Sequence, residues 1–186
     1  MLNTVLGTLS SGVAAATGSY ESIATYTASG GESSFTFSSI PSTYKHLQLR
    51  CLSRRSTGVS HVVALRFNAD SGTNYWWHLL EGDGSTATAS SVSSAANRIQ
   101  TFWPNPSVNL ADQFGAGIID IHDYASTTKN KTVRCFGGGD ANGTGKIDLS
   151  SGLWSNTSAI NEIYVYFLGD TVVANSQFAL YGIKGA

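Results

Sequence analysis

A chain of 186 residues with 41% hydrophobic side chains can bury the core of a single domain without disulfides or metal ions to staple it. Only 12% of the residues are charged, about half the usual share, so hydroxyl groups must solvate much of the surface. The net charge of −1 excludes a long-range field that would attract nucleic acid or an anionic membrane, and no apolar run approaches the roughly 20 residues of a membrane helix.

Residues 1–19 differ from the rest of the chain because they carry no charge and mix apolar with small polar residues. Five apolar residues recur at helix-like intervals and are candidate assembly contacts: Leu2, Val5, Leu6, Leu9 and Val13. The residues between them are poor helix formers, so two interpretations stay open. The segment is either a frayed tail or an N-terminal arm that orders by docking on a neighbouring subunit. It lacks the Lys or Arg of a signal peptide, which favours assembly in the cytoplasm.

Residues 20–186 are predicted to form one antiparallel β-sandwich domain of the all-β class. Short apolar runs alternate with turn clusters at intervals of about 8 to 15 residues, which is typical of a sandwich or barrel. We expect about eleven strands, at Tyr20–Thr27, Ser33–Phe37, Lys45–Arg54, Val59–Asn68, Asn74–Leu80, Arg98–Trp103, Phe114–Asp123, Lys131–Gly137, Lys146–Leu149, Glu162–Leu168 and Gln177–Lys184.

Residues 59–80 are expected to form a β-hairpin at the centre of the sandwich. Apolar residues alternate between Val59 and Phe67, as in a half-buried strand. The turn formers NADSGTN follow. Tyr75–Leu80 then carries large groups at consecutive positions, which predicts a strand covered on both faces.

Other segments are assigned by composition. The run between Gly82 and Asn97 has too few apolar residues to order itself and is predicted to be a surface loop. Prolines end a strand just after Trp103, and the only helical candidate is a turn around Ser155–Asn161. Two strands near the C-terminus are apolar on both faces and should be central: Ile163–Leu168 and Phe178–Ile183.

Cys51 and Cys135 each lie in a predicted strand, on the side expected to face inward. Pairing across strands is conceivable, but two cysteines in a domain of this size do not make a disulfide scaffold. Buried free thiols are therefore the favoured interpretation.

Candidate metal and catalytic residues do not form a recognisable motif. Asp120 and His122 share one strand face beside Asp123, but a third ligand at a readable spacing is missing. The segment Gly137–Gly145 lacks the acidic ligands of a calcium loop and the helix of a phosphate-binding loop, which indicates a hairpin turn. No metal, cofactor or catalytic centre is expected.

The aromatic residues near Glu81 and Asp83 suggest either a carbohydrate site or a core. A glycosidase would need a defined separation of two carboxylates, which the sequence does not provide, so no enzyme is expected. Under a milder hypothesis, glycans stack on four rings: Tyr75, Trp76, Trp77 and Trp103. Burial of these rings in the core is the commoner alternative.

A local basic patch accompanies one predicted strand and the turn after it. It contains Lys45, Arg50, Arg54 and Arg55. No aromatic RNA-binding signature accompanies these residues, so we interpret them as solvated charges and expect no nucleic-acid partner.

Five stretches together resemble a known family. They are Tyr20–Ala24, SSIPSTYKHLQLR from Ser38 to Arg50, RFNADSGTNYWWHLLEGDG from Arg66 to Gly84, GLWSNTSAINEIYVY from Gly152 to Tyr166, and FALYGIKG from Phe178 to Gly185. In this combination and order the chain is similar to virion structural proteins of tailed bacteriophages and prophages. The resemblance covers about Tyr20 to Lys184 and implies a jelly-roll-like sandwich with no catalytic residues.

The resemblance implies a passive role on a virus particle. Members of this kind serve as head decoration proteins, head fibres or tail fibre tips. We therefore expect a capsid decoration or head-surface protein that is assembled in the host cytoplasm, forms a homotrimer and contacts other virion proteins such as the major capsid protein. The alternative is a tail fibre or receptor-binding domain that recognises a host surface glycan.

Overall fold

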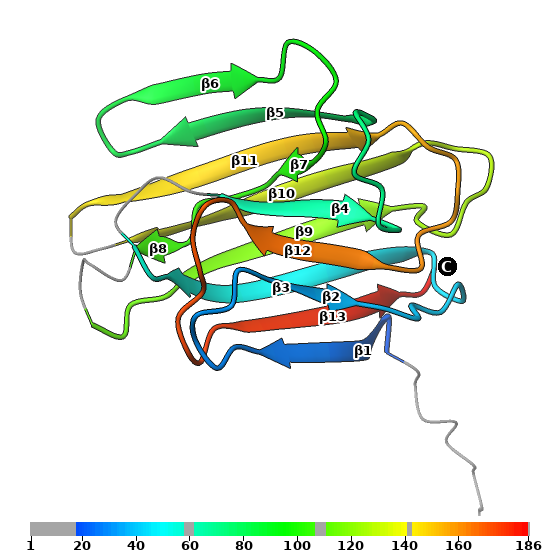
Figure 1. The fold of residues 1–186 in the computed structure, drawn as a ribbon, viewed down its shortest axis with the longest axis horizontal. Coiled ribbons are helices and arrows are strands. Elements are labelled where there is room, and N and C mark those ends of the chain that lie inside the picture. The colour runs from blue at the N-terminus through cyan, green and yellow to red at the C-terminus, as the bar shows by residue number, and fades with distance from the viewer. Residues whose placement is uncertain (1–17, 58–61, 107–110, 141–142, 186) are drawn as a thin grey trace, which may run out of the picture.

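The computed structural model describes residues 18–57, 62–106, 111–140 and 143–185 (Figure 1). These residues form strands and contain no helix, so the all-β sandwich expected from the sequence is confirmed. None of them belongs to a helix that could cross a membrane. The expected arm falls almost entirely on residues 1–17, which lie outside the described residues together with Leu2, Val5, Leu6, Leu9 and Val13. The first strand begins at Tyr20, where the body was expected to start.

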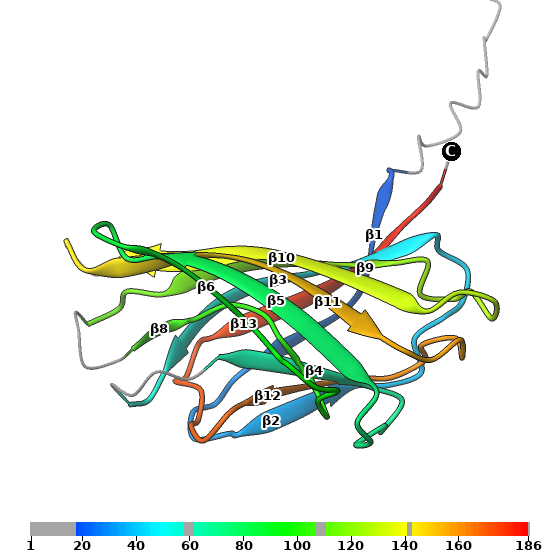
Figure 2. The same ribbon diagram turned by 90° about the horizontal axis from the view of Figure 1, so that it is seen from above.

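Two sheets of unequal size form the layers of the sandwich (Figure 2). The larger sheet has nine strands, in the spatial order β1 (Tyr20–Thr27), β13 (Gln177–Ile183), β3 (His46–Arg55), β9 (Gly115–His122), β10 (Lys131–Asp140), β11 (Gly145–Trp154), β5 (Tyr75–Gly82) and β6 (Ala87–Ser91), with β8 (Asn105–Pro106) paired to β3. The smaller sheet has the order β2 (Ser34–Phe37), β12 (Ile163–Phe167), β4 (Val63–Phe67) and β7 (Ile99–Gln100). All pairings are antiparallel except that of β3 with β8.

The core lies between the two sheets and follows from alternation along each strand. On β3, Leu47, Leu49 and Cys51 are buried and Arg50 is exposed, as a strand with one dry face requires. On the smaller sheet, β4 and β12 direct their apolar residues to the same core. The expected central position of β12 and β13 is confirmed in that each has a hydrogen-bonded neighbour on both sides.

Glycines of the larger sheet let an aromatic ring approach its backbone. A Cβ at Gly117 would lie 2.5 Å from an atom of the Phe102 ring, and a Cβ at Gly137 would lie 2.7 Å from it. Contacts this short are sterically forbidden, so only glycine fits beneath Phe102. This packing seats the segment between β7 and β8 against the inner face of β9 and β10.

The prediction of a β-hairpin over residues 59–80 is wrong, because β4 and β5 belong to different sheets. Their connection crosses between layers and is fixed by hydrogen bonds. The Tyr75 hydroxyl accepts from the Phe67 N–H (3.1 Å) and donates to the Asp70 carbonyl (3.0 Å), and the Trp154 Nε1–H donates to the Asp70 carboxylate (2.8 Å). Val59, at the start of the expected hairpin, lies outside the described residues.

β5 was also expected to be covered on both faces, and this is wrong. Tyr75 and Leu79 are buried, whereas His78 and Leu80 are exposed on the opposite side. The strand thus has one buried and one open face, and its outward apolar residues need another explanation.

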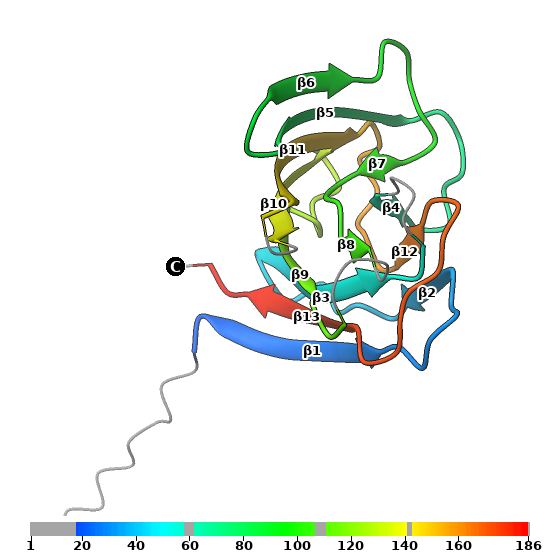
Figure 3. The same cartoon turned by 90° about the vertical axis from the view of Figure 1, so that its left-hand side faces the viewer.

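The surface loop expected between Gly82 and Asn97 contains a strand. β6 pairs with β5 although every residue of β6 is exposed, so backbone hydrogen bonds rather than burial order it. Asp83 fixes the turn by accepting from the N–H groups of Ser85 (2.9 Å) and Thr86 (2.7 Å). β1 and β6 are the two edges of the larger sheet and lie at opposite ends of it (Figure 3).

The helical turn considered for Ser155–Asn161 is absent, and the segment is an irregular loop. Its polar groups bond to distant partners. The Ala159 carbonyl accepts from Asn68 Nδ2 (2.7 Å), the Ile160 N–H donates to the Tyr124 carbonyl (2.8 Å), and the Thr157 carbonyl accepts from Lys131 Nζ (3.1 Å). These tertiary bonds outcompete local helical pairing.

The strand expected over Arg98–Trp103 is shorter in the structure. Only Ile99 and Gln100 pair, as β7, and the prolines that follow restrict the chain before the short strand β8.

Candidate functional site

The outer face of the larger sheet, which points away from the smaller sheet, exposes large apolar side chains. Seven have an exposed fraction between 43% and 55%, and one of them, Tyr20, lies apart on the edge strand β1. We define the apolar face by the other six: Leu52, Leu80, Ile118, Phe136, Ile147 and Leu149. Single exposed apolar residues are ordinary, but a contiguous set on one surface marks an interaction site.

Strand register brings these residues together from distant parts of the chain. Ile118, Phe136, Leu149 and Leu80 are successive cross-strand partners on β9, β10, β11 and β5. We call this row the large row. A second row runs parallel to it and consists of Leu52, Ala116, Gly138, Ile147 and Gly82. We call it the small row, because three of its members are alanine or glycine.

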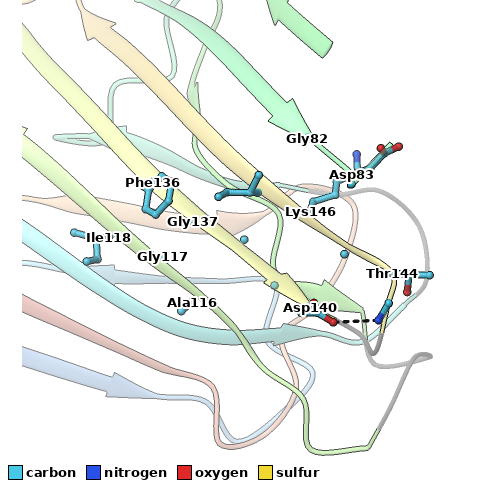
Figure 4. A pocket seen from close by; sticks show the side chains of 16 residues that line it. Gly82, Asp83, Ala116, Gly117, Ile118, Phe136, Gly137, Asp140, Thr144 and Lys146 are labelled. Carbon is cyan, nitrogen blue, oxygen red and sulfur yellow. Dashed lines mark hydrogen bonds between the residues drawn. The ribbon is translucent and has the colours of Figure 1, made fainter. Parts of the chain in front are cut away.

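A groove of about 620 Å³ occupies the glycine-rich end of this face (Figure 4). Ala116, Ile118, Phe136 and Ile147 contribute apolar side chains to its wall. Gly138 forms part of its floor and cannot be replaced, because its φ is +148° and a Cβ would lie 2.2 Å from the Lys146 carbonyl oxygen.

The rim of the groove is polar. Asp83, Asp140 and Thr144 line the groove where β10 turns into β11 and β5 ends. The Asp140 carboxylate accepts from the Gly143 N–H (3.3 Å), so it also closes the turn. The hairpin turn expected over Gly137–Gly145 is confirmed for its described residues by the pairing of Asp140 with Gly145.

A polar row limits the apolar face on its other side. Gln48 Nε2 donates to the Asp120 carboxylate (2.8 Å), and Arg50 Nε donates to Gln48 Oε1 (2.8 Å). The Arg50 guanidinium also lies over the rings of Tyr20 (5.2 Å) and Tyr181 (4.9 Å). Arg50 is thus held at the sheet surface and does not combine with Arg54 and Arg55, which are largely buried, into one basic patch.

The four rings proposed for glycan stacking do not form one platform. Tyr75 is fully buried and packs near Trp154, so its ring cannot receive a sugar. Trp77 is partly buried against the core, and Trp76 lies on the opposite side of β5. Trp103 already has Lys146 Nζ 4.7 Å from its ring centroid.

Asp120 and His122, the candidate dyad, have His46 as a neighbour. Among the described residues they do not belong to a group of three side chains that could hold a metal ion. The His46 and His122 ring centroids are 5.1 Å apart, and His46 Nδ1 accepts a hydrogen bond from the Asp123 N–H (3.0 Å). Partial burial, and then the nearby His122, lower the pKa of His46. The described residues contain no cluster of three or more side chains suited to a metal ion.

The carboxylates considered for glycosidase chemistry are engaged in separate contacts. Glu81 pairs with Lys146 (3.2 Å). Asp83 caps its turn, and the N–H groups of Ser85 and Thr86 lower its pKa to about 2. A general acid needs a raised pKa, so Asp83 is poorly suited to that role.

The core contains two polar features. The first, Asp148, was not singled out from the sequence, and the second, the state of Cys51 and Cys135, was left open by it. Asp148 is buried on the inner face of β11, where one oxygen accepts from the Trp103 N–H (2.8 Å) and burial raises the pKa of the carboxyl to about 6. Cys51 and Cys135 are buried free thiols, as favoured, and burial raises the pKa of both.

The residues of the apolar face were also missed. Their signal is visible on β11, where Ile147 and Leu149 alternate with Asp148 and Ser150. Periodicity alone would turn the apolar pair inward, and the structure does the reverse.

No protein-family model matches the chain, and comparison with the curated proteins and with the solved structures found no significant match. The apolar face and its groove are therefore the features of the described residues that most constrain the function.

Proposed function

We propose that the protein is a structural component of a tailed-phage virion, most simply a capsid decoration or head-surface protein. The observation that carries this proposal is the apolar face, on which six large side chains stay about half exposed on one side of an ordered sheet. Burying such a surface against another protein removes apolar area from water, at about 25 cal/mol per Å². A protein of this design acts by contact.

The resemblance described above supplies the virion context. The stretches that carry it include all of β5, most of β1 and β13 and half of β3, which are framework strands of the larger sheet. The low charge and hydroxyl-rich surface also suit a particle exterior that must stay soluble while its subunits pack closely. The partners in this proposal are copies of the chain and other virion proteins such as the major capsid protein.

Decoration by contact stabilises a shell through mass action, because a protein that binds the assembled state alone shifts the equilibrium toward it. No bond is made or broken in this role. The protein would be made in the host cytoplasm and end in the virion.

Mass spectrometry of purified particles tests the proposal directly. We expect the chain at a copy number proportional to a symmetric site on the head, and imaging should place its density outside the shell. Particles that contain no trace of the chain would refute the proposal.

A second candidate function is glycan recognition by a tail-associated domain, and the groove favours it. The Phe136 ring is 55% exposed there, beside the hydrogen-bonding side chains of Asp83, Asp140 and Thr144. A glycan array probed with the native chain and with Asp140→Ala tests this. Binding that the substitution abolishes would support recognition in the groove, and a blank array would remove the candidate.

A further inference from the structure

We propose that the apolar face is occupied by a second copy of the same chain, packed face to face about a two-fold axis. The axis lies in the plane of the interface, perpendicular to the strands, midway between the large row and the small row. This inference rests on the proposed role of the apolar face in assembly and deepens it by naming the partner.

The first argument is the alternation of large and small residues along three strands. On β9, the neighbour of Ile118 on the same face is Ala116, and on β10, the neighbour of Phe136 is Gly138. On β5, Leu80 is followed by Gly82. In every case the large residue belongs to one row and the small residue to the next.

A rotation about the stated axis turns each strand over its own counterpart and exchanges the two rows. Phe136 of one copy then lies over Gly138 of the other, and Leu80 lies over Gly82. On β11 the rotation sets Leu149 over Ile147, so that strand supplies the one contact between two large residues. Facing layers pack well when large residues meet small ones. A two-fold axis along the strands would instead set the large row on the large row, so that Phe136 would meet a large residue of the partner.

The second argument is charge. Arg134 and Asp140 lie on the outer face of β10, at equal distances along the strand from the axis, and both are exposed. Neither forms an ion pair with another of the described residues. The same rotation places Arg134 over the partner's Asp140, so the contact joins opposite charges twice. The strand-parallel axis would place Arg134 near its own copy.

The third argument is size. The outer face from β3 to β6 spans six neighbouring strands, which at about 4.8 Å each make it about 25 Å wide. From Arg134 to Asp140 it is about 20 Å long at the usual rise per residue. The resulting plane is of the same order as the roughly 800 Å² per partner in a standard interface. A two-fold contact of this kind is favoured here over the homotrimer expected from the resemblance.

Sedimentation velocity and light scattering on the full chain test the inference. We expect a dimer in the micromolar range. Phe136→Ser removes the central large residue, and Gly82→Leu fills the hollow that receives Leu80. A Cβ at Gly82 would meet only Ile147, at an ordinary 3.5 Å, so the second variant should keep its fold. Each should raise the dimer dissociation constant at least about tenfold.

A charge exchange tests the register of the two copies. Arg134→Asp and Asp140→Arg should each weaken the dimer, and the double variant should recover most of the native affinity because the pairs are restored in reverse. Thr36→Asp is the control for an added charge, since Thr36 is exposed on β2 of the smaller sheet, away from the contact. It should leave the dimer intact.

The inference would be overturned by a chain that is still monomeric at 100-fold above the micromolar range, or by a chain that forms a trimer. It would also be overturned by a dimer that tolerates both Phe136→Ser and Gly82→Leu. So would a double charge variant weaker than either single variant. Circular dichroism of each variant separates loss of contact from loss of fold. A monomeric chain that is nonetheless found in purified particles would refute the face-to-face dimer while leaving the virion proposal standing, and a dimeric chain absent from particles would do the opposite.

Discussion

Asp148 and Leu149 are neighbours on β11, and their burial is the reverse of their polarity. The Asp148 side chain is fully buried, whereas Leu149 is 52% exposed on the apolar face. Ile147 and Ser150 continue the inversion. Leaving one leucine half exposed forgoes on the order of 1 kcal/mol of burial, and burying a carboxylate adds a desolvation penalty. The inversion indicates that the outer face of β11 is adapted to a contact rather than to the stability of the isolated chain.

Asp148→Asn should stabilise the protein at alkaline pH and have little effect in acid. Burial raises the pKa of Asp148 from its ordinary value of 3.8 to about 6, so the folded state holds this proton more tightly than the unfolded state. The contribution to stability is complete below pH 3.8 and is lost as the pH rises through about 6. Asparagine keeps an acceptor for the Trp103 N–H and cannot ionise. We expect a gain of about 2 kcal/mol in the free energy of unfolding at pH 8.

Urea unfolding at pH 8 and at pH 4 measures this difference. Asp112→Asn makes the same exchange at an exposed position and should shift neither value appreciably. Equal effects of Asp148→Asn at both pH values would show that the buried carboxyl does not titrate as described.

His46→Asn should remove a loss of stability on acidification. Burial and His122 lower the pKa of His46 from 6.5, and its Nδ1 is an acceptor for the Asp123 N–H (3.0 Å), which requires the neutral ring. A depressed pKa means that the unfolded state binds the proton more tightly. Stability is therefore present above pH 6.5 and falls as the pH drops below it. The Asn side-chain oxygen can accept the same bond without titrating.

The Asp148→Asn variant is the right background for this measurement, because Asp148 titrates in the same range with the opposite sign. The slope of the unfolding free energy between pH 7.5 and 5.5 should become flatter when His46→Asn is added. Other charged groups near His46, namely Lys45, Asp120 and Asp123, remain unchanged in the comparison. An unchanged slope would assign the acid sensitivity to another group.

Strand positions were predictable from the sequence, whereas strand partners were not. Alternation at β1, β3 and β9 is a local signal, so the expected ranges agree with the structure to within a residue or two. Pairing depends on contacts between distant residues. The NADSGTN segment has the composition of a hairpin turn. In the structure, hydrogen bonds from Tyr75 and Trp154 to Asp70 fix it as a connection between the two sheets.

The residues of the apolar face could not be predicted from the sequence for a related reason. Exposed Phe136 and buried Phe102 have the same chemistry, and only the fold places Phe136 on the outer face of β10 and Phe102 against its inner face. The rings chosen from the sequence were selected for size, and size also favours burial, as Tyr75 demonstrates. β6 was missed because its residues bury nothing.

Lys131→Met should be strongly destabilising. The Lys131 side chain is buried, and its Nζ donates to the carbonyl oxygens of Ser126 (2.7 Å), Lys129 (2.7 Å) and Thr157 (3.1 Å). Methionine fills a similar volume but leaves three acceptors without a donor, at an expected cost of about 3 kcal/mol. Chemical denaturation at pH 7 measures it.

Lys129→Met is the matched control for that substitution. Lys129 is 62% exposed at its side chain and pairs with Asp123 (2.7 Å), and an exposed pair of this kind contributes at most about 1 kcal/mol. Similar losses for the two variants would show that the three carbonyl bonds do not hold the loops together.

Gly137→Ala should destabilise the larger sheet through the ring above it. The added Cβ would lie 2.7 Å from Phe102 Cγ, so the ring or the strand must move, at an expected cost of about 2 kcal/mol. Gly82→Ala is the control, because its Cβ would make only an ordinary 3.5 Å contact, and it should be nearly neutral.

Phe102→Leu removes part of the ring and costs stability by itself. In the Gly137→Ala background the two costs should partly cancel, because the smaller side chain relieves the clash. Unfolding free energies of the two single variants and the double variant, measured at one protein concentration, give the coupling. Strictly additive losses would mean that Phe102 does not rest on Gly137, and that another contact seats the segment between β7 and β8.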